Sequence, residues 1–181
     1  IDVRDFNIKT LRSKIGFIRQ KTLLFTGSIK SNIKFGKRKA SHEEMVHSAK
    51  VAQAYDFINK KEKKFDEPIG EGGSNVSGGQ KQRLSIARAL VRKPEIYIFD
   101  DSFSALDFKT DAILRAELKK ETTHAIVLIV AQRIGSIMDA DKIIVLDEGN
   151  VVGIGKHKEL LKTCSVYKEI ALSQLTEEEL A

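Results

Sequence analysis

The sequence predicts an α/β fold with a mostly parallel sheet and flanking helices. Apolar runs of strand length alternate with helical patterns along the chain, which is typical of parallel strands connected by helices. The runs 96–99, 125–130 and 142–146 are largely apolar, and we expect all three to be buried strands. With 181 residues, of which 41% are hydrophobic and 31% charged, the chain has the size and composition of a single soluble domain.

Local signals place the elements of the first half. Residues 13–19 predict a short strand that leads into Gln20. Ser41 is followed three residues later by Glu44, a spacing typical of a capping box. We therefore expect a helix that begins after Ser41 and runs to about Asn59.

The second half continues the alternation. Helices are expected over 80–91 and 110–120. Residues 147–150, with the sequence Asp-Glu-Gly-Asn, predict a turn that returns the chain as a hairpin. The segment 158–180 has the pattern of an amphipathic helix.

The charge of the chain permits two interpretations. A net charge of +6 and a pI near 9.3 could indicate a surface for nucleic acid or acidic lipid. The lysine-rich run 60–64 has no interleaved aromatic residues, which favours solvated lysines and no nucleic-acid partner. The single cysteine, Cys164, fits a reducing compartment.

A carboxylate at the end of the run 96–99 is a candidate magnesium ligand. Asp100 follows the run directly, so it would lie at the carboxyl edge of the sheet, where ligands of α/β domains bind. Mg²⁺ takes hard oxygen ligands, often one or two carboxylates together with nucleotide phosphates. Many buried strands also end in Asp before a turn, so this pattern alone leaves a purely structural role open.

A glycine-containing turn before the helix 80–91 is a candidate phosphate site. Glycine allows the backbone to approach a phosphate closely, and a helix N-terminus offers free N–H groups. Ser77, Gly78, Gly79 and Gln80 supply both features, with a hydroxyl as a further donor. Taken singly, the turn could be an ordinary serine cap, but its short separation from the strand 96–99 favours a joint nucleotide site.

These residues resemble the motifs of ABC transporter ATP-binding domains. The sequence VSGGQKQR over 76–83 is similar to the ABC signature, and Gln20 resembles the Q-loop glutamine. The sequence SALD over 104–107 resembles the D-loop, and the segments 142–149 and 155–160 resemble the closing segments of the family. The stretches 24–33 and 68–73 are similar to ABC exporters in particular.

The resemblance implies a fold, cofactors and site residues. The fold would be that of P-loop ABC ATPases, with a helical signature subdomain over about 33–93 and a RecA-like core with C-terminal helices in the remainder. The cofactors would be ATP and Mg²⁺. Asp100 and Gln20 would serve the metal, with Gln20 also sensing the attacking water. The nucleotide-binding residues would be Ser77, Gly78, Gly79, Gln80 and Asp107.

The resemblance also implies partners. Two such domains would pair head to tail, so that the signature of each contacts ATP held by the other. A transmembrane domain of the same or another chain would place the protein at the cytoplasmic face of a membrane. The domain would then power export of a substrate by ATP hydrolysis.

Two departures from the family pattern lie in the catalytic positions. The family usually has Glu after the strand aspartate, as the base for water, and here Asp101 stands there. Aspartate is one methylene shorter, and a misplacement near 1 Å can lower a rate about a hundredfold. The family usually has His in the switch loop, and here Gln132 stands there, which cannot exchange a proton near neutral pH. The pattern resembles the degenerate half of a heterodimeric exporter.

The phosphate-binding loop of P-loop ATPases is the main feature that the sequence lacks. No G-x-x-x-x-G-K-[ST] occurs in the 181 residues. We therefore expect an N-terminally truncated domain that exposes apolar surface and is inactive alone. Two alternatives stay open: a soluble ABC-class ATPase acting on nucleic acid or translation, and a non-hydrolysing regulatory module.

The missing loop gives a first prediction. The isolated 181-residue chain should show no saturable Mg-ATP binding at micromolar nucleotide, because the loop that holds the phosphates is not in it. Isothermal titration calorimetry measures this directly. A clear micromolar affinity would contradict the expectation and would reveal another phosphate site.

Overall fold

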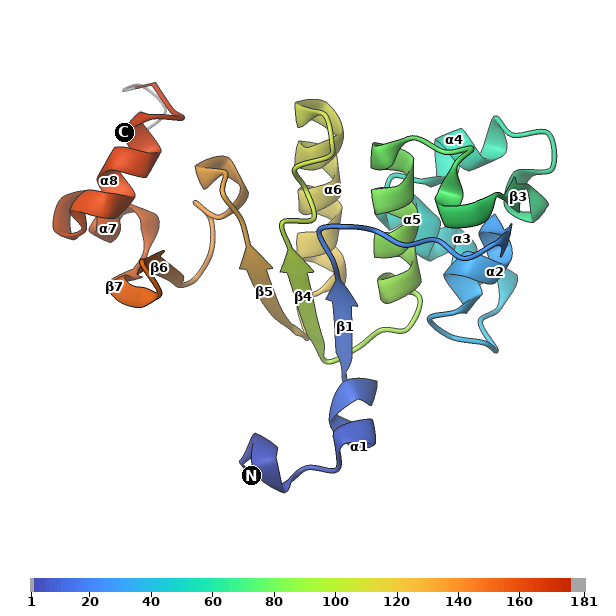
Figure 1. Ribbon diagram of the computed structural model, residues 1–181, viewed down its shortest axis with the longest axis horizontal. Coiled ribbons are helices and arrows are strands. Elements are labelled where there is room, and N and C mark those ends of the chain that lie inside the picture. Colours follow the sequence, from blue (N-terminus) through green and yellow to red (C-terminus); the bar gives the residue numbers. More distant parts are fainter. Residues whose placement is uncertain (1, 177–181) are drawn as a thin grey trace. The chain divides into compact units, whose positions relative to one another are not determined.

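The computed structural model describes residues 2–176 and divides the chain into two compact units, Ile1–Val130 and Ala131–Ala181. The first unit contains a parallel sheet of three strands in the order β1-β4-β5 (Figure 1). These strands are β1 (Ile15–Ile18), β4 (Ile96–Asp100) and β5 (Ile126–Val130). The predicted α/β architecture with a parallel sheet is confirmed.

Strand β4 is the central strand and carries much of the core. Tyr97 and Phe99 are buried, and Phe99 stacks on Phe103 with ring centroids 5.2 Å apart. Helix α5 (Gly78–Leu90) precedes β4, and helix α6 (Phe108–Glu121) joins it to β5. Because the strands run in the same direction, their carboxyl ends meet at one edge of the sheet, where Ile18 pairs with Phe99 and Asp100 with Val130.

A helical lobe lies beside the sheet within the first unit (Figure 1). It packs α2 (Ile29–Lys34), α3 (His42–Val51) and α4 (Tyr55–Asn59) with α5 around one apolar core. A short antiparallel strand pair joins the two ends of this stretch of chain. Its strands are β2 (Gly27–Ser28), which directly precedes α2, and β3 (Pro68–Ile69). The fully buried large side chains of this lobe are Ile29, Ile33, Met45, Ile58, Ile69, Leu84 and Ile86.

The expected single helix from 41 to 59 is wrong in one respect. The capping box of Ser41 and Glu44 is present, but α3 ends at Val51 and α4 begins at Tyr55. The interruption contains Gln53, whose φ of 54° is left-handed and cannot continue a helix. Apolar periodicity continues through the break, which is why the sequence pattern missed it.

Strand β5 is present but is not buried as predicted. Ile126, Leu128 and Val130 expose 60%, 52% and 58% of their surface. The strand pairs with β4 along one edge only, and no described element of the first unit covers these side chains. The expected exposed apolar surface therefore lies on this strand.

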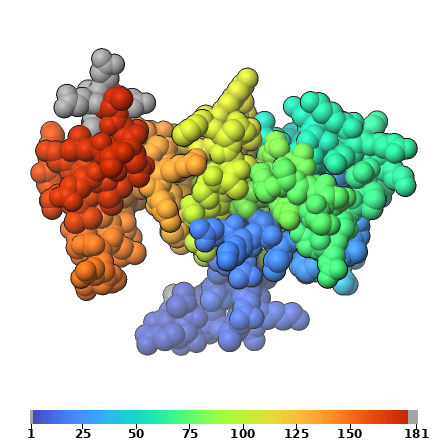
Figure 2. Space-filling view, turned by 45° about the horizontal axis from the view of Figure 1, so that its top comes forward, coloured from blue at the N-terminus to red at the C-terminus, as the bar shows by residue number. Residues whose placement is uncertain are grey.

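The N-terminal segment stands out from the rest of the first unit (Figure 2). It contains a 3₁₀ helix, η1 (Val3–Asp5), and a short helix, α1 (Ile8–Ser13), capped by Asn7. None of the residues in these two helices is buried. Further 3₁₀ turns are η2 (Lys64–Asp66), η3 (Glu71–Gly73) and, in the second unit, η4 (Ile134–Ser136).

The second unit is built on a hairpin. Strands β6 (Ile143–Asp147) and β7 (Asn150–Gly155) are antiparallel, as the predicted hairpin requires, but the run 142–146 is not fully buried as expected. Only Ile143 and Val145 of β6 are buried, because one face of the hairpin packs on helices. The predicted turn is confirmed, with Glu148 and Gly149 both at positive φ.

Two helices complete the second unit. They are α7 (His157–Thr163) and α8 (Ser165–Leu172), so the expected single helix 158–180 is interrupted at Cys164. Residues 177–180 of that expectation lie outside the described residues. Leu160 and Tyr167 bury against the hairpin, and His157 hydrogen-bonds the Tyr167 hydroxyl at 2.8 Å.

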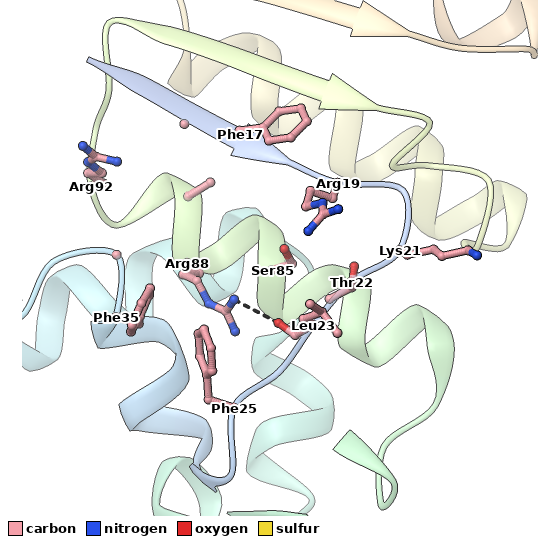
Figure 3. Close-up of a pocket in the computed structure, with 13 residues that line it drawn as sticks. Phe17, Arg19, Lys21, Thr22, Leu23, Phe25, Phe35, Ser85, Arg88 and Arg92 are labelled. Carbon is pink, nitrogen blue, oxygen red and sulfur yellow. Dashed lines mark hydrogen bonds between the residues drawn. The ribbon is translucent and has the colours of Figure 1, made fainter. Parts of the chain in front are cut away.

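A half-buried arginine fastens α5 to α2 and to the chain after Gln20. Arg88 donates to the backbone and side-chain oxygens of Asn32 and to the carbonyl of Leu23, at 2.8–3.0 Å. Its guanidinium also lies over the rings of Phe25 and Phe35 (Figure 3). Burial lowers the pKa of the Arg88 guanidinium, although an arginine remains charged in proteins.

The close approach of α2 and α5 gives a second prediction. A Cβ at Gly36 would lie 2.0 Å from the Arg88 carbonyl oxygen and 3.1 Å from a Val91 methyl group. Gly36→Ala should therefore force the helices apart and destabilise the protein by about 1–3 kcal/mol, as overpacking does. Urea unfolding would report it as a lower midpoint. Gly135→Ala, where a Cβ would meet nothing within 4 Å, is the matched control and should unfold like wild type.

Candidate functional site

The glycine-containing turn is the N-terminus of helix α5, as predicted. Ser77 is the N-cap, and its hydroxyl accepts a hydrogen bond from the Gln80 backbone N–H at 3.3 Å. The Gln80 side chain accepts from the Ser77 N–H at 3.2 Å, which completes a capping box. The helix begins at Gly78, two residues earlier than the pattern suggested. The turn thus presents a positive helix end.

The two glycines of this turn have different surroundings. A Cβ at Gly78 would meet nothing within 4 Å, so this position faces open space. A Cβ at Gly79 would lie 3.2 Å from the carbonyl oxygen of Ala105. The turn before α5 and the segment 104–107 therefore pack closely, and Gly78 is the open side at which a ligand can approach.

Asp107 is the N-cap of α6. Its carboxylate accepts from the Thr110 N–H at 2.9 Å. This hydrogen bond is the main reason that the pKa of Asp107 lies below its usual value, and Arg83 contributes more weakly. Asp107 therefore has a structural role as a cap in addition to the nucleotide contact that the sequence suggested.

Asp100 ends strand β4 at the carboxyl edge of the sheet, and Asp101 follows it directly. Asp101 adopts φ 42°, and its N–H donates to the carbonyl of Val130 at 2.9 Å. A left-handed backbone is uncommon for residues other than glycine, but Asp tolerates it better than most. The buried Ser102 follows and donates to the carbonyl of Ile18 at 2.9 Å. The ends of β1 and β4 are thus held together.

Gln20 and Asp101 are in direct contact, although 81 residues separate them in sequence. The side-chain amide of Gln20 donates to a carboxylate oxygen of Asp101 at 2.8 Å. Both residues follow neighbouring parallel strands, so the sheet register brings them to one place. This contact brings together two of the predicted catalytic residues.

The oxygen donors at this edge fit a magnesium ion that is also bound by phosphates. Asp100 and Asp101 supply carboxylates, and the amide oxygen of Gln20 is a further hard donor. Among the described residues no group of three or more His, Cys, Asp or Glu side chains could hold a metal alone. Mg²⁺ commonly keeps waters and phosphate ligands and uses only one or two carboxylates, so this donor set is sufficient.

Gln132 belongs to the second unit, and its surroundings are described there. Its side chain is exposed, and its backbone carbonyl accepts from the Gln174 amide at 2.8 Å. The oxygen of that amide accepts from the Ile134 N–H at 2.9 Å. The loop after β5 is therefore fastened through its backbone, which leaves the Gln132 side chain available.

Gln82 and Ser102 were missed by the sequence reasoning. Gln82 is 2% exposed on the buried face of α5, four residues before the buried Ile86. A polar residue within an apolar helical stripe was the available signal. Ser102 had no comparable signal, because its contact with Ile18 spans 84 residues.

A shallow groove opens beside the chain that follows Gln20 (Figure 3). Exposed apolar side chains line it, among them Phe17 and Leu23, which expose 52% and 62% of their surface. Arg88 lies at its base, beside the rings of Phe25 and Phe35, which pack on each other. The groove is lined by β1, by the chain after Gln20, by the end of α2 and by α5.

Comparison with known proteins agrees with this geometry. The ABC transporter family model matches residues 1–104. An uncharacterised ABC transporter ATP-binding protein of Bacillus subtilis, YfiB, is 46% identical over 97% of this chain and 30% of its own length. Multidrug resistance protein 1 of Entamoeba histolytica is 42% identical over 98% of this chain and 14% of its length.

A solved structure gives the same result. A bacterial Atm1-family ABC exporter with ATP bound superposes with a TM-score of 0.93 and 36% identity, over 97% of this chain and 31% of the exporter chain. The chain therefore spans less than a third of the length of these relatives. No described helix of this chain has the length and apolar character needed to cross a bilayer.

Proposed function

This chain belongs to the ABC transporter family, and we propose that it is the ATP-binding part of an exporter that moves a substrate across a membrane. The observation that carries the proposal is the pairing of two half-sites in one unit. A capped helix N-terminus with an open Gly78 can receive a phosphate, and a separate carboxylate edge with Gln20 can receive a magnesium nucleotide. Neither half-site resembles a complete nucleotide site by itself.

We propose that a second ABC domain completes each half-site. In a head-to-tail pair, Ser77, Gly78 and Gly79 would contact ATP held by the partner, with Gln80 as part of the same turn and Asp107 nearby in the D-loop. Asp100, with Gln20, would hold the magnesium of the nucleotide that this domain binds. When bound, magnesium neutralises charge that develops on the phosphates.

We further propose that the local catalytic site is degenerate. Asp101 already has a hydrogen bond from Gln20, and its carboxylate is one methylene shorter than the family's glutamate. Gln132, as an amide, can hydrogen-bond a phosphate but cannot take up a proton near neutral pH. This domain would therefore hold its own nucleotide for long periods while its signature turn serves a competent partner site.

The groove beside Gln20 supports a transmembrane partner at the cytoplasmic face. Exposed aromatic and aliphatic side chains gathered in one place are typical of a surface that another chain covers. Leu23 and Phe25 lie a few residues after Gln20, so a segment of the transmembrane domain bound there could move Gln20. Such a contact would couple the transport of substrate in the membrane to the binding of nucleotide in this domain.

A non-hydrolysing regulatory domain is the second candidate function. The 2.8 Å hydrogen bond between Gln20 and Asp101 favours it, because it engages one oxygen of the carboxylate that would otherwise activate water. In that case nucleotide would only clamp the two domains together. The two functions differ in turnover at this site.

The division of labour gives a third prediction, which tests the proposed function. In the full-length transporter with its partner, Ser77→Phe should lower steady-state ATPase activity about a hundredfold or more, because oxyanion-type donors of this kind have such effects. Asp101→Asn should leave a large fraction of the activity, because this site contributes little turnover. Ser173→Phe, an equally bulky change at an exposed residue of the second unit, is the control.

The variants Ser77→Phe and Asp101→Asn distinguish a heterodimer with a degenerate site from a homodimer with two working sites. A loss for Asp101→Asn as complete as that for Ser77→Phe would contradict degeneracy and favour a homodimer that uses Asp101 as its base. Full activity of Ser77→Phe would contradict the role of the signature turn.

The paired departures give a fourth prediction. Asp101→Glu alone should restore little hydrolysis at this site, because Gln132 still cannot exchange a proton. Asp101→Glu together with Gln132→His should restore more, in site-resolved single-turnover measurements on the full-length protein. If both variants match wild type, these two residues do not limit the rate.

A further inference from the structure

Gln82 is a buried polar residue that the proposed function does not use. It lies on α5, five residues after Ser77, and is only 2% exposed. Burying an amide is unfavourable unless its donors and acceptors are paired. The partners of Gln82 therefore indicate what the residue holds in place.

Both partners of the Gln82 amide lie on the chain around Gln20. The amide oxygen accepts a hydrogen bond from the Thr22 hydroxyl. The amide nitrogen donates to the backbone carbonyl of Arg19 at 3.4 Å. One side chain of the signature helix thus bridges the residues on either side of positions 20 and 21.

The same stretch is held from the sheet by Ser102. Its hydroxyl donates to the carbonyl of Ile18 at 2.9 Å, one residue before the carbonyl that Gln82 contacts. The backbone that enters Gln20 is therefore fixed from β4 on one side and from α5 on the other. Gln20 is exposed, and the amide that it directs at Asp101 is aimed by the backbone around it.

We propose that Gln82 is a positioning residue that sets the direction of Gln20, and that through it the signature helix and the magnesium-facing glutamine move as one. This inference rests on the proposed function and deepens it. A displacement of the N-terminus of α5 by the partner's nucleotide would be transmitted through Gln82 to residues 19–22. The nucleotide of the partner site and the nucleotide of this site would thereby be coupled within one chain.

The alternative is that Gln82 only fills space in the core. In that case an apolar residue of similar volume would serve as well, and often better, because no buried amide would need partners. Gln82→Met keeps the volume and removes both hydrogen bonds. Thr22→Val removes the hydrogen bond from Thr22 to Gln82, at a half-buried position where the change is mild. Thr22→Ser is the conservative variant, because it keeps the hydroxyl.

Hydrogen–deuterium exchange of the full-length, nucleotide-free protein tests the mechanical part. Exchange of the peptide that covers residues 19–23 should become about tenfold faster in Gln82→Met and Thr22→Val, and return to the wild-type rate in Thr22→Ser. Ser48→Ala is the matched control, because it removes a 2% exposed hydroxyl that bonds only within its own helix, to Met45. It should leave this peptide unchanged.

Magnesium dependence tests the functional part. Site-resolved photolabelling of this chain by azido-ATP should need about tenfold more Mg²⁺ for half-maximal labelling in Gln20→Ala, as expected when a metal-site contact is lost. Gln82→Met and Thr22→Val should show a similar shift. The double variant Gln20→Ala with Gln82→Met should shift no further than Gln20→Ala alone, because Gln82 acts through Gln20.

The outcomes separate the inference from the function beneath it. A shift in Gln20→Ala that neither Gln82→Met nor Thr22→Val reproduces would overturn the inference alone. Additive shifts in the double variant would do the same, since they would mean that Gln82 acts independently. Absence of magnesium-dependent labelling in the wild-type protein would overturn the proposed function together with the inference.

Discussion

The guanidinium of Arg88 is a half-buried charge that the first unit surrounds with neutral acceptors. Its partners in the described structure are oxygens of Asn32 and Leu23, together with two aromatic faces. A partly desolvated cation is stabilised when its donors are paired, so these partners together hold the Arg88 side chain in one place. Asn32 in turn accepts from the Phe25 N–H and donates to the Phe25 carbonyl, which closes the network.

This network fixes the chain that leaves the sheet. The backbone after Gln20 would otherwise be a connector between β1 and the helical lobe, with little reason for one conformation. Arg88 and Asn32 hold its far end at Leu23 and Phe25, while Gln82 and Ser102 hold its near end. The segment is therefore held at both ends, and the exposed Gln20 lies within it.

The sequence predicted the parts of the site that depend on local patterns. The cap at Ser77, the carboxylate at the end of β4 and the capping box at Ser41 all follow from a few neighbouring residues, and each is present. The contact of Gln20 with Asp101 and the links of Gln82 and Arg88 join residues 56 to 81 positions apart. Such partners are set by sheet register and helix packing, which no local pattern contains. The prediction that β5 is buried was wrong for a related reason. The burial of a strand depends on the elements that pack against it and not only on its composition.

The left-handed backbone of Asp101 sets what can replace it. The residues that this φ favours most are glycine and asparagine, and neither carries a carboxylate. Glutamate has the longer reach that water activation needs but gains less from the local geometry, since Asp and Asn tolerate this region best. The replacements that best suit the main chain at position 101 thus remove the acid, and the one that lengthens the acid suits the main chain less well. Selection for stability alone at position 101 would therefore favour residues without a carboxylate, and such residues could not support ATP hydrolysis.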